Sequence, residues 1–251
     1  IYFAHSMDGV IDAGFVRGGY RENSVFRIER YFDRIDFKLQ NTTFYFNPEN
    51  PLSKAAEANI NQPLFLSEKI AAASSDTDSS KLRRYLIEAD NLFFGENFLQ
   101  IKPSKQPGDR GDGFNLGTLN NKKSKYIWVK SFPENSDVAV EYVYENPQPV
   151  NYGSDEVTDA RFVSIKMQHT LMAMPESDYT PRYDDPRVGF FLDKVTDQTS
   201  TSVTPWRDLV NRWNLKKKDP NAAVSEPVKP IVWWIENTTP IEFRTVIRDA
   251  V

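Results

Sequence analysis

The 251-residue chain contains no cysteine and only two histidines, His5 and His169, which lie far apart in the sequence. It therefore forms no disulfide, which leaves its redox compartment open, and a zinc site within it would need carboxylates for most ligands. The HExxH pattern is absent, as are the GxSxG pattern of serine hydrolases and the glycine-rich patterns that bind nucleotides. We expect no catalytic residue, no cofactor-binding residue and no metal ligand in this chain.

The chain also lacks a strong charge of one sign and a long apolar run. Its formal net charge is −4 and its pI is about 5.4, which argues against nucleic acid or an anionic membrane as the main partner. No apolar stretch is long enough to span a bilayer, and the start, at Ile1, has neither the basic nor the apolar segment of a signal peptide. We interpret both ends as processed or truncated.

Aromatic residues and proline are abundant, with 17 Phe, 11 Tyr, 5 Trp and 16 Pro. This composition favours a β-rich structure with many ordered turns. Alternation of apolar and polar residues predicts a hairpin over 24–40, a second hairpin over 125–145 and a long strand over 161–174. Two further strands are expected in 62–74 and 81–94. The predicted fold class is α+β, predominantly antiparallel β with short helices.

Helical spacing predicts short helices after the turn in 47–60 and over 205–215. The last segment, "PIVWWIENTTPIEFRTVIRDAV", predicts a buried strand over 230–235 and then an amphipathic helix. Thr239 is the expected N-cap of this helix, and Glu242 completes a capping box. We divide the chain into a β-rich N-terminal domain over 1–175, an extended proline-containing connector over 176–229 and a C-terminal strand and helix over 230–251.

Each histidine has a structural interpretation. His169 lies on the apolar face of the strand over 161–174, which predicts a hydrogen-bonded histidine in the core. His5 follows the apolar run "IYFA" and is expected to end that strand at the surface. The sequons at Asn41 and Asn237 match glycosylation sites, and we interpret Asn237 as a turn residue.

The densest polar cluster is "RYDDPRVGFF", residues 182–191. Asp184 and Asp185 would serve in acid–base catalysis if they were buried together. Because Arg182 and Arg187 flank them, we favour arginine–carboxylate pairing that fixes a turn. Gly189 indicates a close backbone approach or a bulge.

The stretch "GDRGDG", residues 108–113, has two functional interpretations. It lacks the alternating carboxylates and distal glutamate of a calcium-binding loop, and an Arg-Gly-Asp tripeptide is common by chance. We favour a flexible glycine-rich loop and leave calcium binding open.

The C-terminal third carries a family resemblance in two ordered stretches, "DYTPRYDDPRVGFF" and "WNLKKKDPNAAVSEPVKPIVWWIENTTP". They are similar to the region ahead of the HExxH motif in bacterial zinc-dependent metalloproteases of the met-zincin type, which carry N-terminal domains of unknown function (DUF5117-like). The resemblance covers about residues 20–251 and is specific from about residue 178. The residues that carry it as a structural family motif are Arg182, Asp185, Arg187, Gly189, Trp213, Asp219, Pro220, Trp233 and Trp234.

The resemblance implies that this chain is the non-catalytic N-terminal portion of a secreted or periplasmic zinc metalloendopeptidase, inactive alone, and that it acts as a scaffold or cover for the catalytic domain. Residues 230–251 would be the first strand and helix of that domain. Zinc would be bound elsewhere in the full-length protein. The expected partners are the remainder of the catalytic domain, joined covalently or after nicking, and a protein or peptide substrate.

Two other functions remain open at this stage. One is a β-rich binding module for peptide or glycan with no enzymatic activity. The other is an independent hydrolase that uses carboxylates such as Asp184 and Asp185.

Overall fold

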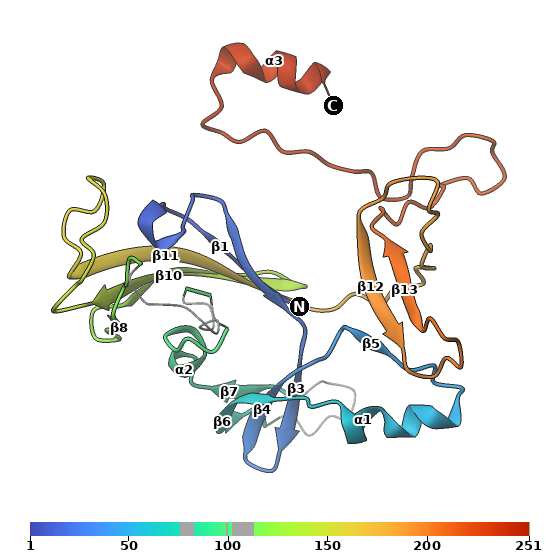
Figure 1. Cartoon of the computed structure of the whole chain (residues 1–251), viewed down its shortest axis with the longest axis horizontal. Coiled ribbons are helices and arrows are strands. Elements are labelled where there is room, and N and C mark those ends of the chain that lie inside the picture. Colours follow the sequence, from blue (N-terminus) through green and yellow to red (C-terminus); the bar gives the residue numbers. More distant parts are fainter. Residues whose placement is uncertain (76–82, 99, 102–112, 251) are drawn as a thin grey trace. The chain divides into compact units, whose positions relative to one another are not determined.

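A computed structural model of the chain describes residues 1–75, 83–98, 100–101 and 113–250 (Figure 1). Contacts divide the chain into two compact units. The first unit comprises Ile1–Glu176 and Val195–Trp206, and the second comprises Ser177–Lys194 and Arg207–Val251. The sequence-based division at residues 175 and 229 stays a prediction. Among the described residues, no helix is both long and apolar enough to cross a membrane.

The largest sheet of the first unit is antiparallel, with strand order β2-β1-β11-β10-β8 and with β9 also paired to β10. Its strands are β1 (Tyr2–Ser6), β2 (Tyr20–Ser24), β8 (Thr118–Leu119), β9 (Lys125–Ser131), β10 (Asn135–Glu145) and β11 (Phe162–Met172). The hairpin predicted over 125–145 and the strand predicted over 161–174 are confirmed as β9, β10 and β11. His5 lies half-buried inside β1, so the prediction that it ends the strand at the surface is wrong.

A second antiparallel sheet has the order β3-β4-β6-β7. Its strands are β3 (Phe26–Tyr31), β4 (Arg34–Leu39), β6 (Leu64–Ala73) and β7 (Tyr85–Ile87). Phe32, at φ 51°, and Asp33 form the turn of the predicted β3–β4 hairpin. The strand predicted over 81–94 is wrong in its second half, which forms helix α2 (Asp90–Phe93) because the amides of Leu92 and Phe93 both donate to the Ala89 carbonyl.

A third sheet has the order β13-β12-β5 and contains β5 (Phe44–Tyr45), β12 (Leu192–Asp197) and β13 (Trp206–Val210). β12 pairs with β5 in parallel. The prediction of a helix over 205–215 is wrong, because backbone groups of β13 form hydrogen bonds with a distant segment. The Val210 amide donates to the Arg182 carbonyl, and the Asp184 amide donates to the Asp208 carbonyl. The remaining helices are η1 (Ile11–Ala13), η2 (Pro51–Ala55), α1 (Ala56–Asn59) and α3 (Ile241–Asp249).

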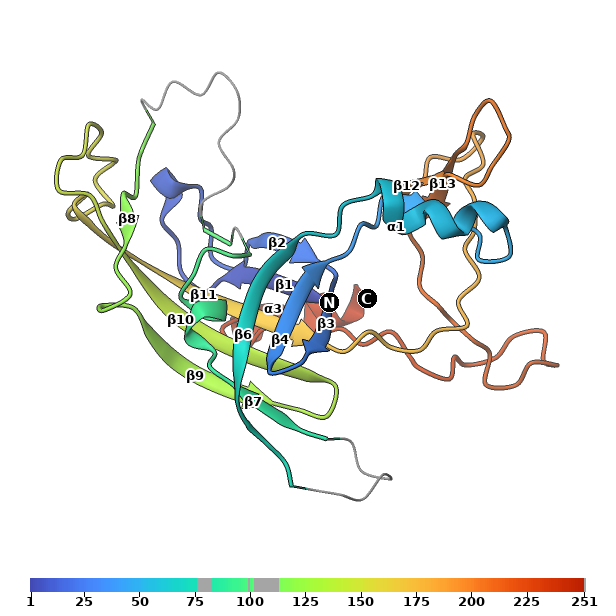
Figure 2. The ribbon, with the colours of Figure 1, turned by 90° about the horizontal axis from the view of Figure 1, so that it is seen from below.

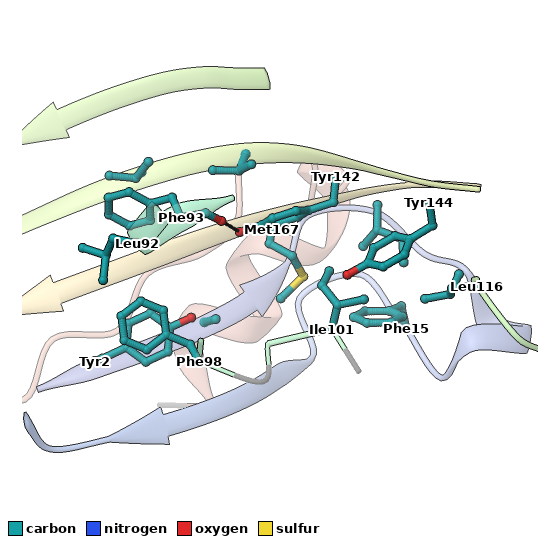
Figure 3. Packing of buried hydrophobic residues seen from close by; sticks show 14 of the residues in the cluster. Tyr2, Phe15, Leu92, Phe93, Phe98, Ile101, Leu116, Tyr142, Tyr144 and Met167 are labelled. Carbon is teal, nitrogen blue, oxygen red and sulfur yellow. Dashed lines mark hydrogen bonds between the residues drawn. The ribbon is translucent and has the colours of Figure 1, made fainter. Parts of the chain in front are cut away.

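The core of the first unit lies between the first two sheets. Figure 2 shows β3, β4 and β6 crossing over β10 and β11, and buried residues of both sheets join one cluster. Alternation along β10 turns Val140, Tyr142 and Tyr144 inward, where they meet side chains of β1, β11 and α2 (Figure 3). Tyr2 stacks on Phe98 with ring centroids 3.8 Å apart. Because aromatic rings bury large areas, they make the main contribution to this core.

Two glycines at positive φ differ in how much space their surroundings leave for a side chain. Gly117 has φ +79°, and a Cβ placed on it would lie 2.2 Å from the Glu145 carbonyl oxygen. Gly18 has φ +77°, but its Cβ would meet no atom within 4 Å. We expect Gly117→Ala to lower the free energy of unfolding by about 2 kcal/mol, through strain and displacement of β10, and Gly18→Ala by about 1 kcal/mol, through strain alone. Urea unfolding of both variants measures this, and equal losses would contradict it.

Candidate binding groove

The first unit contains a groove of about 740 Å³ along β3. It is lined by Ile1 and by residues 25–28, 40–42, 132–136 and 171–174. These segments are the start of β3, the chain after β4, the β9–β10 turn with the start of β10, and the end of β11 with the residues after it. Such a volume falls in the range of grooves that bind ligands.

One wall of the groove is the edge of β3. A groove over the face of a strand touches alternate residues, whereas this one touches four consecutive residues, 25–28. β3 pairs with β4, and β3 is the terminal strand of its sheet. The groove therefore lies along a strand edge rather than on a sheet face.

The hydrogen-bond pattern shows which backbone groups β3 presents at this edge. The Gln40 amide donates to the Val25 carbonyl at 2.8 Å, so Val25 and Gln40 form a hydrogen-bonded pair. Since these pairs alternate along an antiparallel ladder, Arg27 and Glu29 also bond to β4. The N–H and C=O groups of Phe26, Ile28 and Arg30 point the other way, and no other described strand pairs with them.

Exposed apolar side chains line the rest of the groove. Ile28 is 58% exposed, Phe132 54%, Met172 37% and Met174 61%. Two of the four methionines of the chain lie here. Methionine side chains are flexible and polarizable, and they are common on surfaces that accept varied apolar partners. Four neighbouring exposed apolar side chains indicate an interaction site.

Few charges reach the groove. The Arg27 guanidinium lies 3.4 Å from the Glu29 carboxylate. The Ile1 amine donates to the Met172 carbonyl at 2.8 Å, and partial burial lowers its pKa. Glu134 is an acidic residue that lines the groove. The groove thus suits a mainly uncharged ligand, with one carboxylate available to a basic group.

A buried polar network lies deeper in the same unit, around His169. The His169 side chain has no exposed area, and its Nδ1 lies 2.9 Å from the Tyr2 hydroxyl and its Nε2 2.8 Å from the Tyr142 hydroxyl. The Tyr142 hydroxyl donates its one proton to the Phe93 carbonyl at 2.5 Å. It therefore accepts from His169, which places the imidazole proton on Nε2 and makes Tyr2 the donor to Nδ1.

This network confirms the prediction of a hydrogen-bonded core histidine. Burial lowers the pKa of His169 from 6.5 to about 3, with a smaller contribution from His5, so the imidazole is neutral at pH 7. Both of its nitrogens are hydrogen-bonded to tyrosine hydroxyls, so neither is available to a metal or a substrate. The His5 pKa is also lowered, mainly by burial, while Asp137 acts in the opposite direction.

Among the predicted motif residues, those of 182–191 form a turn in the second unit. Arg187 binds both carboxylate oxygens of Asp185, at 2.8 and 2.5 Å, which confirms the predicted arginine–carboxylate pairing and lowers the Asp185 pKa. The Arg182 guanidinium lies over the Phe190 ring at 5.2 Å. A Cβ on Gly189 would meet no atom within 4 Å, so the predicted close approach there is wrong.

Asp184 and Asp185 do not form a carboxylate pair suited to acid–base catalysis. Asp185 is held by Arg187, whereas Oδ1 of Asp184 is buried without a hydrogen-bond partner among the described residues. Acid–base work by two carboxylates requires that one of them holds a proton near neutral pH. The lowered pKa of Asp185 acts against that arrangement.

A loop of the second unit, whose two sides are joined by backbone hydrogen bonds, contains Asp219 and Pro220. Trp213 lies just before this loop in the chain. The Lys218 amide donates to the Glu226 carbonyl, and the Val228 amide to the Lys216 carbonyl. The Asp219 carboxylate accepts from the Asn221 amide at 3.0 Å, which fixes the turn at Pro220. Trp213 is 64% exposed.

The segment 230–235 was predicted to be a buried strand, and this is wrong. It forms no strand, and Trp233 and Trp234 are 68% and 90% exposed. The helix after it is confirmed as α3, but its N-cap is Pro240 without a side-chain bond, so the predicted capping box at Thr239 and Glu242 is also wrong. Arg244 instead donates to the carbonyls of Thr239 and Asn237. All of the apolar side chains of α3 stay at least partly exposed.

The predicted motif residues lie in the second unit, and none of them lines the groove. Of the loop 108–113, with its calcium and Arg-Gly-Asp interpretations, residues 108–112 lie outside the described residues. Within 1–75, 83–98, 100–101 and 113–250, no group of three or more His, Cys, Asp and Glu is placed to hold a metal ion.

Sequence reasoning missed the groove residues, because the segments that build it are separated in the chain. The available local signals were Met172 and Met174, apolar residues at positions of the alternation that are mostly polar in β11, and Ile28 next to two charged residues in β3.

The fold and the groove together define a β-rich domain with a ligand-sized groove at an open strand edge. The chain belongs to the family described as "Domain of unknown function (DUF5117)", whose model matches residues 18–218. No curated protein and no solved structure matches the chain.

Proposed function

We propose that this chain is a non-catalytic portion of a zinc-dependent metalloendopeptidase and that it supports or covers the catalytic portion. The sequence motifs in 182–191 and 213–235 favour this parent enzyme. The observation that carries the proposal is the exposure of segment 231–250, in which Trp233, Trp234 and Phe243 are all more than half exposed. A large apolar surface in a continuous segment is typical of a site that packs against another domain.

Zinc in such an enzyme would activate the attacking water, with a glutamate as general base. The described residues of this chain do not fit a zinc site. They contain no suitable cluster of ligands, and both nitrogens of His169 are engaged by tyrosines. Metal and general base would therefore come from outside the described residues.

Replacement of Trp233 and Trp234 together by alanine tests the proposal. In the isolated chain both side chains are exposed, so the variant is expected to change the free energy of unfolding by less than about 0.5 kcal/mol. In the product of the complete gene, where they would pack on the catalytic portion, we expect a loss of about 2 kcal/mol and reduced casein cleavage. Thermal unfolding and a chelator-sensitive cleavage assay measure both effects. An equal change in the free energy of unfolding in the isolated chain and in the complete product would refute the proposal. Casein cleavage by the isolated chain would also refute it.

A second candidate function, a peptide-binding module without enzymatic activity, is favoured by the groove. Its apolar lining, its low charge and the open edge of β3 suit a polypeptide ligand. The two candidates are compatible, because a non-catalytic portion of a protease can also hold substrate.

A further inference from the structure

We propose that an extended polypeptide segment binds in the groove as an additional strand on β3. This inference rests on the peptide-binding candidate and does not depend on the identity of the parent enzyme. The partner is defined by its chemistry: a strand with alternating apolar side chains and a basic residue near one end.

The backbone of β3 provides the first reason. Phe26, Ile28 and Arg30 direct their N–H and C=O groups away from β4, and no other described strand pairs with them. An unpaired strand edge is a template for another strand, and proteins often protect such edges. Here the edge opens onto the groove, so an added strand would have room beside it.

The apolar residues that line the groove are the second reason to expect an added strand. Because side chains alternate along a strand, every second side chain of the added strand would lie on the same sheet face as Phe26 and Ile28. Leu171, Met172 and Met174 also line the groove and would contact an added strand. Phe26 already packs with Phe98 in the core, which anchors β3 at this edge. The methionines would adapt to apolar side chains of different shapes.

Charge provides the third reason. Glu29 pairs with both Lys38, at 2.7 Å, and Arg27, at 3.4 Å, while Glu134, which also lines the groove, has no salt bridge among the described residues. A lysine or arginine of the ligand would face this carboxylate. The negative net charge of the chain, −4, acts in the same direction.

Fluorescence anisotropy with a labelled peptide tests the proposal. The probe is the alternating peptide Lys-Val-Thr-Leu-Thr-Val-Lys, and its control is the same peptide with N-methyl groups on alternate backbone nitrogens. We expect saturable binding of the probe, and binding of the methylated peptide weaker by about tenfold or more, because N-methylation removes the donors needed for strand pairing. Absence of binding overturns both the peptide-binding candidate and this inference, whereas equal binding of the two peptides overturns strand addition alone.

Variants of the chain locate the site. Ile28→Pro removes an N–H that bonds no other described strand, whereas Ile28→Ala shortens the side chain and keeps the N–H. We expect Ile28→Pro to weaken binding about tenfold and Ile28→Ala about threefold. Met174→Lys, in the groove, is compared with Leu86→Lys on β7, because the two side chains are similarly exposed, at 61% and 63%. Met174→Lys should weaken binding about tenfold and Leu86→Lys less than twofold, and the opposite order would exclude the groove.

Hydrogen exchange of the unmodified chain gives a readout that does not depend on the folding of a variant. The amides of Arg27 and Glu29 are bonded to β4, whereas those of Ile28 and Arg30 point away from it. Bound peptide should slow exchange at Ile28 and Arg30 by about tenfold and leave Arg27 and Glu29 nearly unchanged. Protection that is absent at Ile28 while the peptide is bound would overturn the proposal.

Discussion

Acidification from pH 6.5 to pH 5 is expected to lower the free energy of unfolding by about 2 kcal/mol, through His169 alone. The pKa of His169 is about 3 in the folded protein and near 6.5 when the chain is unfolded. Between these values the unfolded state binds a proton that the folded state excludes, so stability decreases as pH falls. Well above pH 6.5 the imidazole is neutral in both states, and the contribution is complete. Over the whole interval down to pH 3 the loss is on the order of 4 kcal/mol.

Urea unfolding at pH 7.5, 6.5, 5.5 and 5.0 measures this dependence, in a range where carboxylates are still ionised. His169→Gln removes the group with the large shift, so its stability should be lower at pH 7.5 and should fall much less on acidification, with only the dependence from His5 remaining. His5→Gln serves as the control. It removes the other histidine, whose pKa is also lowered but which lies in a half-buried site, and so it shows how much of the pH dependence comes from His5. A flat profile for the unmodified chain, or an unchanged slope in His169→Gln, would contradict the account of the network.

Tyr142→Phe is expected to cost about 3 kcal/mol of unfolding free energy, although it removes a single oxygen atom. The Tyr142 hydroxyl is fully buried, accepts from His169 Nε2 at 2.8 Å and from Gln100 Nε2 at 3.2 Å, and donates to the Phe93 carbonyl. Its removal leaves three buried polar groups without this partner, and each such group carries a desolvation penalty.

Tyr126→Phe is the matched control for this substitution. The Tyr126 hydroxyl donates to Asp90 at 3.0 Å in an exposed position, where water replaces the lost bond. We expect a loss below about 1 kcal/mol. Urea unfolding at pH 7.5 compares the two variants. Similar losses in both, or a loss below about 1 kcal/mol for Tyr142→Phe, would show that the buried network contributes little to stability.

The sequence predicted those parts of the fold that depend on local alternation. β10 and β11 turn every second side chain into the core, so the pattern around His169 identified both the strand and the buried position of the histidine. The β3–β4 hairpin was predictable because its two apolar runs flank a short turn. In the same way, the pairing of Asp185 with Arg187 follows from their spacing, since it involves neighbours in one turn.

Elements that depend on distant partners could not be predicted in this way. Trp206, Leu209 and Val210 have a spacing that suits a helix, yet 206–210 is a strand because its backbone bonds to chain segments before it. The apolar run 230–235 favours a buried strand in any local analysis, but burial requires a partner surface, and Trp234 stays 90% exposed. The groove arises where Ile1, β3, the β9–β10 turn and the end of β11 meet, so no single stretch encodes it.

Zinc content is the most direct test of the central claim, that this chain is a non-catalytic portion of a zinc-dependent endopeptidase. The chain and the product of its complete gene are purified in parallel, dialysed against trace zinc and analysed by inductively coupled plasma mass spectrometry. The account predicts stoichiometric zinc and chelator-sensitive casein cleavage in the complete product, and neither in the chain. Zinc bound by the chain itself, or a complete product without zinc, would contradict it.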